Sequence, residues 1–284
     1  MTFNSRLRHS ALMLRTIAHL LLIAVATLAA TACREPERPH SFTIATTTSV
    51  DNSGLLRHLA DTFTRETGLE PRWIAVGSGK ALQMGAEARV DVVISHDPER
   101  EKQFVGSGHA SLHEPFARND FILIGPASNP AHVASGDSAA AAFAKIFESG
   151  SRFVSRSDSS GTHAREILIW KEAGITPGGD TYFQMGQSMS ALLRSARELD
   201  AYTLTDRATF LQVGDRRTQR VVLDRDPMFR NVYSVILPRQ GTSTENAQGA
   251  RRFAEWLISE SGQKSIAAFR IRGAAAFTPA ARHP

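Results

Sequence analysis

The chain has 284 residues, of which 42% are hydrophobic and 21% charged, a composition that is ordinary for a globular protein of one or two domains. Its formal net charge is +5, but it has no basic run interleaved with aromatic residues, so the sequence does not indicate nucleic-acid binding. The single cysteine excludes an internal disulfide.

The first 32 residues have the order of a secretory signal peptide. A start with three arginines is followed by an apolar stretch over residues 17–30 and by the small residues Ala30-Thr31-Ala32. The apolar stretch is shorter than the roughly 20 residues of a membrane span, so a retained membrane helix is the weaker alternative. We expect residues 1–32 to be removed, and taking three arginines from +5 leaves a net charge of +2.

Cys33 directly follows the expected cleavage site and resembles the lipidated cysteine of bacterial lipoproteins. Ala30 stands where that motif prefers leucine, and the same three small residues also fit an ordinary export site. We expect a lipid anchor at Cys33, a polar tether over residues 33–40, and a protein in the periplasm or on the outer face of the cell membrane. The only contact with a membrane would be through this anchor.

From Ser41 onward, short apolar runs alternate with helical patterns. The strands are predicted at 41–47, 71–77, 91–96, 120–125, 152–156, 201–205, 220–223 and 231–237. The helices are predicted at 53–67, 160–173, 188–199 and 245–269. This alternation predicts an α/β fold, in which ligands bind at the carboxyl ends of strands, where helices begin.

Hydroxyl-rich segments occur at four of these strand–helix junctions. They are Thr46-Thr47-Thr48-Ser49, the turn around Ser78 in VGSGKAL, SRSDSSGTH from Ser155 to His163, and the run around Ser188 in MGQSMS. Helix N-termini offer free N–H groups and a partial positive charge, glycines allow close approach, and hydroxyls donate without adding charge. Together these features indicate an anion site, although each junction alone is typical of a plain helix cap.

Enzyme motifs are weaker. GSGKA lacks the spacing and the final Ser or Thr of a phosphate-binding Walker loop, and no G-x-S-x-G elbow occurs. The histidines at 96, 109, 113 and 163 lack metal-ligand spacing and are interpreted as surface or structural residues. We therefore expect no enzyme activity, no cofactor and no metal ion.

The motifs TTTS, VGSGKAL, DVVISHDP, NDFILIGP, FVSRSDSSGTH, AYTLTDR and SGQKSIAAF, in this order, resemble the tungstate-binding proteins of bacterial ABC transporters over nearly all of residues 42–270. The resemblance implies a two-lobed periplasmic-binding-protein fold of type II, with a ligand cleft between the lobes. Residues 41–120 and 232–284 would form the first lobe, and residues 121–231 the second.

The resemblance also implies the ligand-binding residues, which lie in the matching motifs. They are Thr47, Ser49, Ser78, Arg156, Ser160, Thr162, Ser188 and Met189, the last two through backbone N–H groups. The chain departs from the family pattern at Ser157, Ser188 and Ser190, which stand where the family usually has glycine.

The implied function is capture of tungstate, a tetrahedral oxyanion bound through its oxygens, and its delivery to the permease and ATPase subunits of an ABC importer. Molybdate and phosphate are the alternatives among binding proteins. Asp158 could accept the proton of monohydrogen phosphate, but it is better interpreted as a structural cap of its turn. An extracytoplasmic hydrolase of phosphorylated small molecules is the alternative from another class.

Overall fold

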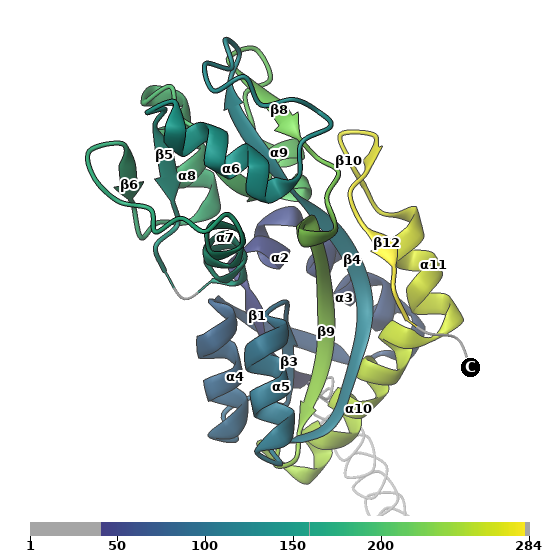
Figure 1. The fold of residues 1–284 in the computed structure, drawn as a ribbon. Helices are drawn as coiled ribbons and strands as arrows, with labels where there is room; N and C mark the ends of the chain where they lie inside the picture. The colour runs from purple at the N-terminus through teal and green to yellow at the C-terminus, as the bar shows by residue number, and fades with distance from the viewer. Residues whose placement is uncertain (1–40, 159, 282–284) are drawn as a thin grey trace, which may run out of the picture. The chain divides into compact units, whose positions relative to one another are not determined.

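The computed structural model describes residues 41–158 and 160–281. The predicted signal peptide and tether, including Cys33, lie outside these residues. No helix of the described part is long and apolar enough to cross a membrane. The described chain is a mixed α/β structure that forms one compact unit, and its ribbon is traced in Figure 1.

The first part of the main sheet is parallel. β1 (Ser41–Thr47) pairs in parallel with β2 (Glu70–Val76) on one side and with β3 (Val92–Ser95) on the other. The carboxyl ends of these three strands therefore meet at one edge, where helices begin (Figure 1). Strand–helix alternation predicted this arrangement from the sequence.

Two long antiparallel strands continue the sheet. β9 (Arg230–Pro238) pairs with β3, and β4 (Ala110–Pro126) pairs with β9 (Figure 1). In this pairing Asn119 lies opposite Asn231. The 17-residue β4 is much longer than the predicted strand 120–125.

The end of β4 belongs to a second group of strands. Its residues from Phe121 to Pro126 pair with β7 (Thr203–Asp206) and β8 (Gln219–Leu223). The remaining short strands are β5 (Phe153–Ser155) with β6 (Tyr182–Gln184), β10 (Arg270–Ile271) with β11 (Ala274–Ala275), and β12 (Thr278–Pro279) on the edge of β4.

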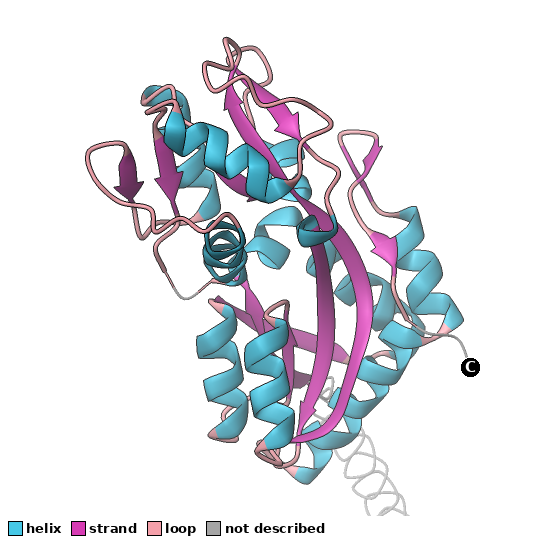
Figure 2. Ribbon diagram, in the orientation of Figure 1, coloured by secondary structure: helices cyan, strands magenta, loops and turns pink. Residues whose placement is uncertain are grey.

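Helices follow most of the strands, as Figure 2 shows in cyan. Their bounds are α2 (Thr48–Ser53), α3 (Leu55–Thr67), α4 (Ser78–Ala86), α5 (Pro98–Gly106), α6 (Ala139–Glu148), α7 (Gly161–Glu172), α8 (Met189–Glu198), α9 (Arg207–Val213), α10 (Thr244–Ile258) and α11 (Glu260–Ala268). A short 3-10 helix, η1 (Pro227–Phe229), precedes β9.

Two predicted helices differ from the structure at their boundaries. The predicted helix 53–67 corresponds to α3, and the short α2 before it was not predicted; Gly54 at φ 78°, a left-handed conformation, ends α2 at low cost and separates the two helices. The predicted helix 245–269 is α10 and α11, separated by Ser259 in extended conformation. The Ser259 hydroxyl accepts from the Gly262 N–H, so the same residue starts α11.

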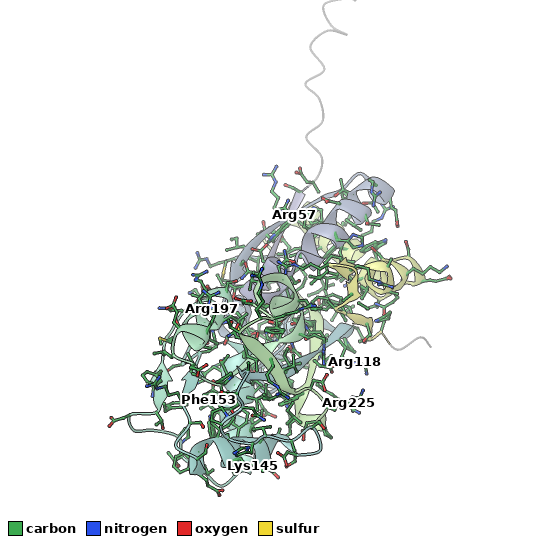
Figure 3. All side chains as sticks on the ribbon, turned by 90° about the horizontal axis from the view of Figure 1, so that it is seen from above. Arg57, Arg118, Lys145, Phe153, Arg197 and Arg225 are labelled. Atoms are coloured by element: carbon green, nitrogen blue, oxygen red, sulfur yellow. The ribbon has the colours of Figure 1, made fainter. Side chains whose placement is uncertain are left out.

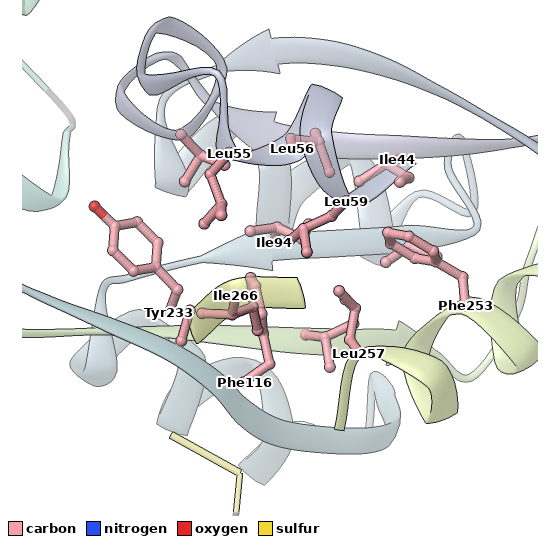
Figure 4. Close-up of a cluster of buried hydrophobic side chains, with 14 of the residues drawn as sticks. Ile44, Leu55, Leu56, Leu59, Ile94, Phe116, Tyr233, Phe253, Leu257 and Ile266 are labelled. Carbon is pink, nitrogen blue, oxygen red and sulfur yellow. The ribbon is translucent and has the colours of Figure 1, made fainter. Parts of the chain in front are cut away.

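The buried apolar residues form separate clusters. The largest gathers side chains from β1, α3, β3, β9, α10 and α11, among them Leu56, Ile94 and Phe253 in Figure 4. Another cluster is built entirely from residues 121–229, around Phe143, Phe153 and Trp170. The first cluster also includes Ala208 from the range expected for the second lobe, and the lobe boundaries stay a prediction.

Candidate functional site

The predicted ligand residues lie at the starts of four helices. Thr47 ends β1 and caps α2, where its hydroxyl accepts from the Val50 N–H at 3.5 Å. Ser160 caps α7 and Ser188 caps α8 in the same way. The helix-cap interpretation therefore holds for these three hydroxyls. Ser78, the first residue of α4, makes no such bond, because Gly77 is the cap residue there.

Most of this set is buried. Seven of the eight predicted residues are at most 9% exposed: Thr47, Ser49, Ser78, Arg156, Ser160, Thr162 and Met189. Ser188 is exposed. A buried polar group without a partner is costly. Within the described residues the hydroxyls of Ser78 and Thr46 are buried and have no hydrogen-bond partner. They are the groups that a bound acceptor could satisfy.

Arg156 is the buried cation of the candidate site. It directly follows β5, is 5% exposed, and forms an ion pair with Asp158 in its own turn. The arginines at 57, 118, 197 and 225 lie instead on the outside of the ribbon (Figure 3). Arg156 is therefore a buried arginine that is paired with a carboxylate of its own turn, and not one of the exposed arginines of the surface.

A buried carboxyl, that of Glu166, is hydrogen-bonded to the turn that contains Arg156. Glu166 on α7 accepts from the Ser155 hydroxyl at 3.0 Å and from the Tyr182 hydroxyl at 2.7 Å. Ser155 in turn accepts from the Ser157 N–H at 3.1 Å. Burial raises the pKa of Glu166 above its usual range, against the effect of these hydrogen bonds.

The loop before α8 is tied to the same turn by its backbone. The Met185 N–H donates to the Ser155 carbonyl and the Gly186 N–H to the Arg156 carbonyl, at 3.1 and 2.9 Å.

Two of the serines that stand where the family usually has glycine differ in backbone conformation. Ser157 has φ 44°, in the left-handed region that favours glycine, whereas Ser188 has φ −60° and is unstrained.

His96 is a candidate site residue that the sequence interpretation missed. It follows β3, is 5% exposed, and its Nε2 lies 3.4 Å from the Ser49 hydroxyl. Ser49 is also 3.1 Å from the Thr47 hydroxyl. On its other side the ring faces Gly161, where an added Cβ would lie 2.6 Å from His96 Cε1. Its position at the carboxyl end of a buried strand was the available signal.

A buried polar network extends from His96 to the long strand pair. Asn231 on β9 accepts from His96 and donates to Asn119 on β4, at 2.8 and 2.7 Å. Asn119 donates to Asp206, which also caps α9 at Thr209. Burial raises the pKa of Asp206 and lowers that of His96, the latter against the nearby negative charges.

A pocket of about 600 Å³ opens beside this network, lined by the first turns of α5 and α7. It reaches His96, Asp158, Ser160 and Gly161. These contacts link two groups of predicted residues, because His96 touches Ser49, beside Thr47, and also the start of α7. Among the described residues, no hydrogen bond joins Ser78 or Met189 directly to the other predicted ligand residues.

The donor set suits an anion better than a metal ion or a catalytic reaction. Neutral hydroxyls, one arginine and helix N-termini all donate hydrogen bonds or attract negative charge. The described residues contain no group of three or more His, Cys, Asp or Glu side chains that could hold a metal ion.

Comparison with known proteins identifies relatives with the same fold. Residues 33–261 match the family described as PBP superfamily domain. The tungstate-binding protein TupA of Peptoclostridium acidaminophilum is 37% identical over 283 residues, covering 94% of this chain and 99% of the relative. The predicted periplasmic-binding-protein fold is thereby confirmed.

Two solved structures agree. The tungstate-binding protein TupA from Desulfovibrio alaskensis G20 has a TM-score of 0.74 at 39% identity, covering 86% of this chain and 100% of that chain. The tungstate ABC transporter protein from Geobacter sulfurreducens has a TM-score of 0.73 at 32% identity, covering 81% and 98%. The chain therefore belongs to the TupA family of tungstate-binding proteins, within the PBP superfamily.

Proposed function

We propose that this protein captures tungstate outside the cytoplasm and delivers it to an ABC importer. The observation that carries the proposal is the buried Arg156, which stands in a hydroxyl-rich helix-opening turn of a chain from the TupA family. The family consists of transporter binding proteins, so the expected activity is reversible binding without turnover.

The ligand chemistry matches the donors. Tungstate is a tetrahedral dianion near neutral pH, so its oxygens accept hydrogen bonds and offer no protons. Arg156 supplies one positive charge and a planar fork of donors. The hydroxyl donors are Thr47, Ser49, Ser78, Ser160 and Thr162. The backbone N–H groups of Ser188 and Met189 at the start of α8 add the partial positive charge of a helix N-terminus.

Export and membrane attachment complete the proposal. Residues 1–32 would direct export, and lipidation of Cys33 would hold the protein at the outer face of the membrane through the tether 33–40. Permease and ATPase subunits would receive the loaded protein. No cofactor is needed, because the oxyanion binds through its own oxygens.

Molybdate and phosphate are the ligands from which tungstate must be distinguished. Molybdate is nearly the same in size and charge, so the site chemistry favours both. Monohydrogen phosphate needs an acceptor for its proton. Both oxygens of Asp158 are engaged, one by Arg156 and the other by the Ser160 N–H at 2.9 Å, which argues against that role.

A thermal-shift panel tests the proposal directly, using tungstate, molybdate, sulfate, phosphate and chromate. A ligand that binds only the folded protein stabilises it by RT ln(1 + [L]/Kd), about 4 kcal/mol at a thousandfold excess over Kd. Tungstate should give the largest shift. A shift with phosphate alone, or turnover of a generic phosphoester, would overturn the proposal.

A further inference from the structure

His96 lies between the two groups of candidate ligand residues. Its Nε2 faces the Ser49 hydroxyl at 3.4 Å, and its ring is packed so closely on Gly161 that no larger residue fits there without a shift. The ring also lies beside Tyr233, with centroids 4.9 Å apart. A group in this position can influence the ligand without contacting it.

The surrounding hydrogen bonds fix which ring nitrogen carries the proton. The Asn231 amide nitrogen donates to the Asn119 side-chain oxygen at 2.7 Å and to the Tyr233 hydroxyl at 2.8 Å. Its oxygen is therefore the atom 2.8 Å from His96 Nδ1, so Nδ1–H is the donor. In the neutral ring Nε2 carries no hydrogen, so in its contact with Ser49 it can only accept.

A hydrogen bond that runs from the Ser49 hydroxyl to His96 removes a donor from the candidate site. A serine hydroxyl has one hydrogen. When Ser49 gives it to neutral His96, the Thr47 hydroxyl 3.1 Å away can donate to the Ser49 oxygen, so that Ser49 has no hydrogen left for a ligand. If the imidazole gains a proton on Nε2, the hydrogen bond reverses and Nε2–H donates to the Ser49 oxygen. The hydroxyl hydrogen is then free to donate to a bound oxyanion.

We propose that His96 is a positioning residue that controls the direction of the Ser49 hydroxyl and takes up one solvent proton when the oxyanion binds. This inference rests on the proposed function and extends it, because it couples oxyanion capture to proton concentration. Proton uptake both frees the Ser49 donor and places a positive charge beside the dianion.

The charges around His96 set the direction of the pH effect. Burial lowers the pKa of His96, and it outweighs the Asn231 hydrogen bond and the acidic groups, which raise the pKa. The titratable and charged groups near His96 are Asp97, Glu101, Asp206 and Tyr233, and those that line the same pocket are Glu99, Arg100, Asp158, His163 and Arg165. A bound dianion raises the pKa of His96. Tungstate affinity should therefore increase as pH falls from the His96 pKa of the ligand-bound protein to that of the ligand-free protein.

Calorimetric titration with tungstate tests this in the full mature chain. Measurements run from about pH 5.5 to about pH 8.5 at fixed ionic strength, in paired non-phosphate buffers that differ in ionisation enthalpy. In wild type we expect affinity to rise by up to about tenfold per pH unit as pH falls, with buffer-dependent heats that report proton uptake. His96→Gln should lose both effects, whereas His109→Gln, at an exposed histidine, should keep them.

Histidine ¹⁵N spectra of the wild type give a second measurement that needs no variant to fold. At high pH without ligand, one buried histidine should be protonated on Nδ1 only, and tungstate should protonate its Nε2. Tight tungstate binding without a pH slope, with His96 neutral throughout, would overturn the inference and leave the proposed function intact. Absence of tungstate binding at every pH would overturn both.

Discussion

Arg156 donates from Nε and Nη2 to the same oxygen, Oδ2, of Asp158 two residues along its turn. The other Asp158 oxygen accepts from the Ser160 N–H at the start of α7. One carboxylate thus holds both the arginine and the helix start. Within the described part of the chain, Nη1 of Arg156 has no hydrogen-bond partner, so its N–H groups could donate to a ligand.

Replacing Arg156 should therefore weaken tungstate binding strongly. Removing one partner of a buried, hydrogen-bonded charge pair costs about 2–5 kcal/mol. Arg156→Ala should lose roughly 30- to several-thousand-fold in affinity, measured by calorimetry. Arg156→Lys should recover part of this, since it keeps the charge but loses the planar fork. A folded Arg156→Ala protein that binds within about threefold of wild type would place the site elsewhere.

The Asp158 carboxylate should lower the affinity of the site for tungstate. Its carboxylate occupies two arginine donors and adds negative charge beside a dianion. Asp158→Asn keeps an oxygen for the Ser160 N–H but removes the charge, so tungstate affinity should increase by about threefold to tenfold, most clearly at low salt. Asp158→Ala is the comparison variant, because it also removes the acceptor of the Ser160 N–H. Weaker binding by the Asn variant would mean that the ion pair positions Arg156 for the ligand.

Ser78 should affect binding and stability in opposite directions. Its hydroxyl is fully buried and has no partner among the described residues. Ser78→Ala should leave the free energy of unfolding unchanged or raise it by about 1 kcal/mol, because an unsatisfied group is removed. Tungstate affinity should fall by about fivefold to 150-fold, corresponding to about 1–3 kcal/mol.

The matched control is Ser138, which caps α6 away from the candidate site by accepting from the Ala141 N–H at 3.1 Å. Ser138→Ala should lose about 1 kcal/mol of stability and keep its affinity for tungstate. Chemical denaturation and calorimetry on both variants separate a helix cap from a ligand donor. Equal affinity losses in the two variants would count against a ligand role for Ser78.

Local chemistry explains why much of the fold could be predicted. β1 was predicted with its observed bounds, 41–47, because its alternation and the hydroxyl cap at Thr47 are adjacent in sequence. The start of α7 was similarly visible, since Ser160 caps it directly. The first half of β4 could not be found, because it is largely exposed, contains Pro115, and forms by pairing with β9 more than 100 residues away.

The candidate site was predictable where a motif carries it, and not where distant residues make it. Thr47, Ser78 and Arg156 stand in short recognisable turns. The role of His96 depends on Asn231, 135 positions along the chain, and on the absence of a side chain at Gly161. No local pattern around His96 contains either contact. A long-range hydrogen-bond network of this kind becomes visible only in the folded chain.

Cys33 should control where the mature protein is found. If it is the lipidated first residue, Cys33→Ala should either block processing or release soluble protein into the periplasm. Fractionation with mass spectrometry of the mature N-terminus measures this. Arg34→Ala, beside the same site, should leave processing and anchoring unchanged. Wild-type protein that is wholly soluble and unmodified after export would remove the lipid anchor and leave tungstate binding untouched.

The pair of Glu101 on α5 and His113 on β4 should give the protein's stability a pH optimum. His113 Nε2 lies 2.9 Å from the Glu101 carboxylate, which is 3% exposed. The hydrogen bond to Glu101 raises the pKa of His113. Burial raises the pKa of Glu101, but hydrogen bonds, first from His113, outweigh it and hold this pKa below its usual value.

These two shifts act at opposite ends of the pH range. The His113 contribution is fully present below the pKa of an unfolded histidine, about 6.5, and is lost as pH rises through the higher pKa of the folded state. The Glu101 contribution is present above the pKa of an unfolded glutamate, about 4.3, and is lost as pH falls through its lower folded value. Thermal unfolding of the ligand-free protein should therefore show its highest midpoint between these limits.

His113→Gln keeps a donor to Glu101 but cannot ionise, so it should lower the midpoint near neutral pH and remove the decline on the alkaline side. His109→Gln, at an exposed histidine without a carboxylate contact among the described residues, should retain the wild-type profile. An alkaline decline that persists unchanged in His113→Gln would show that another group produces it.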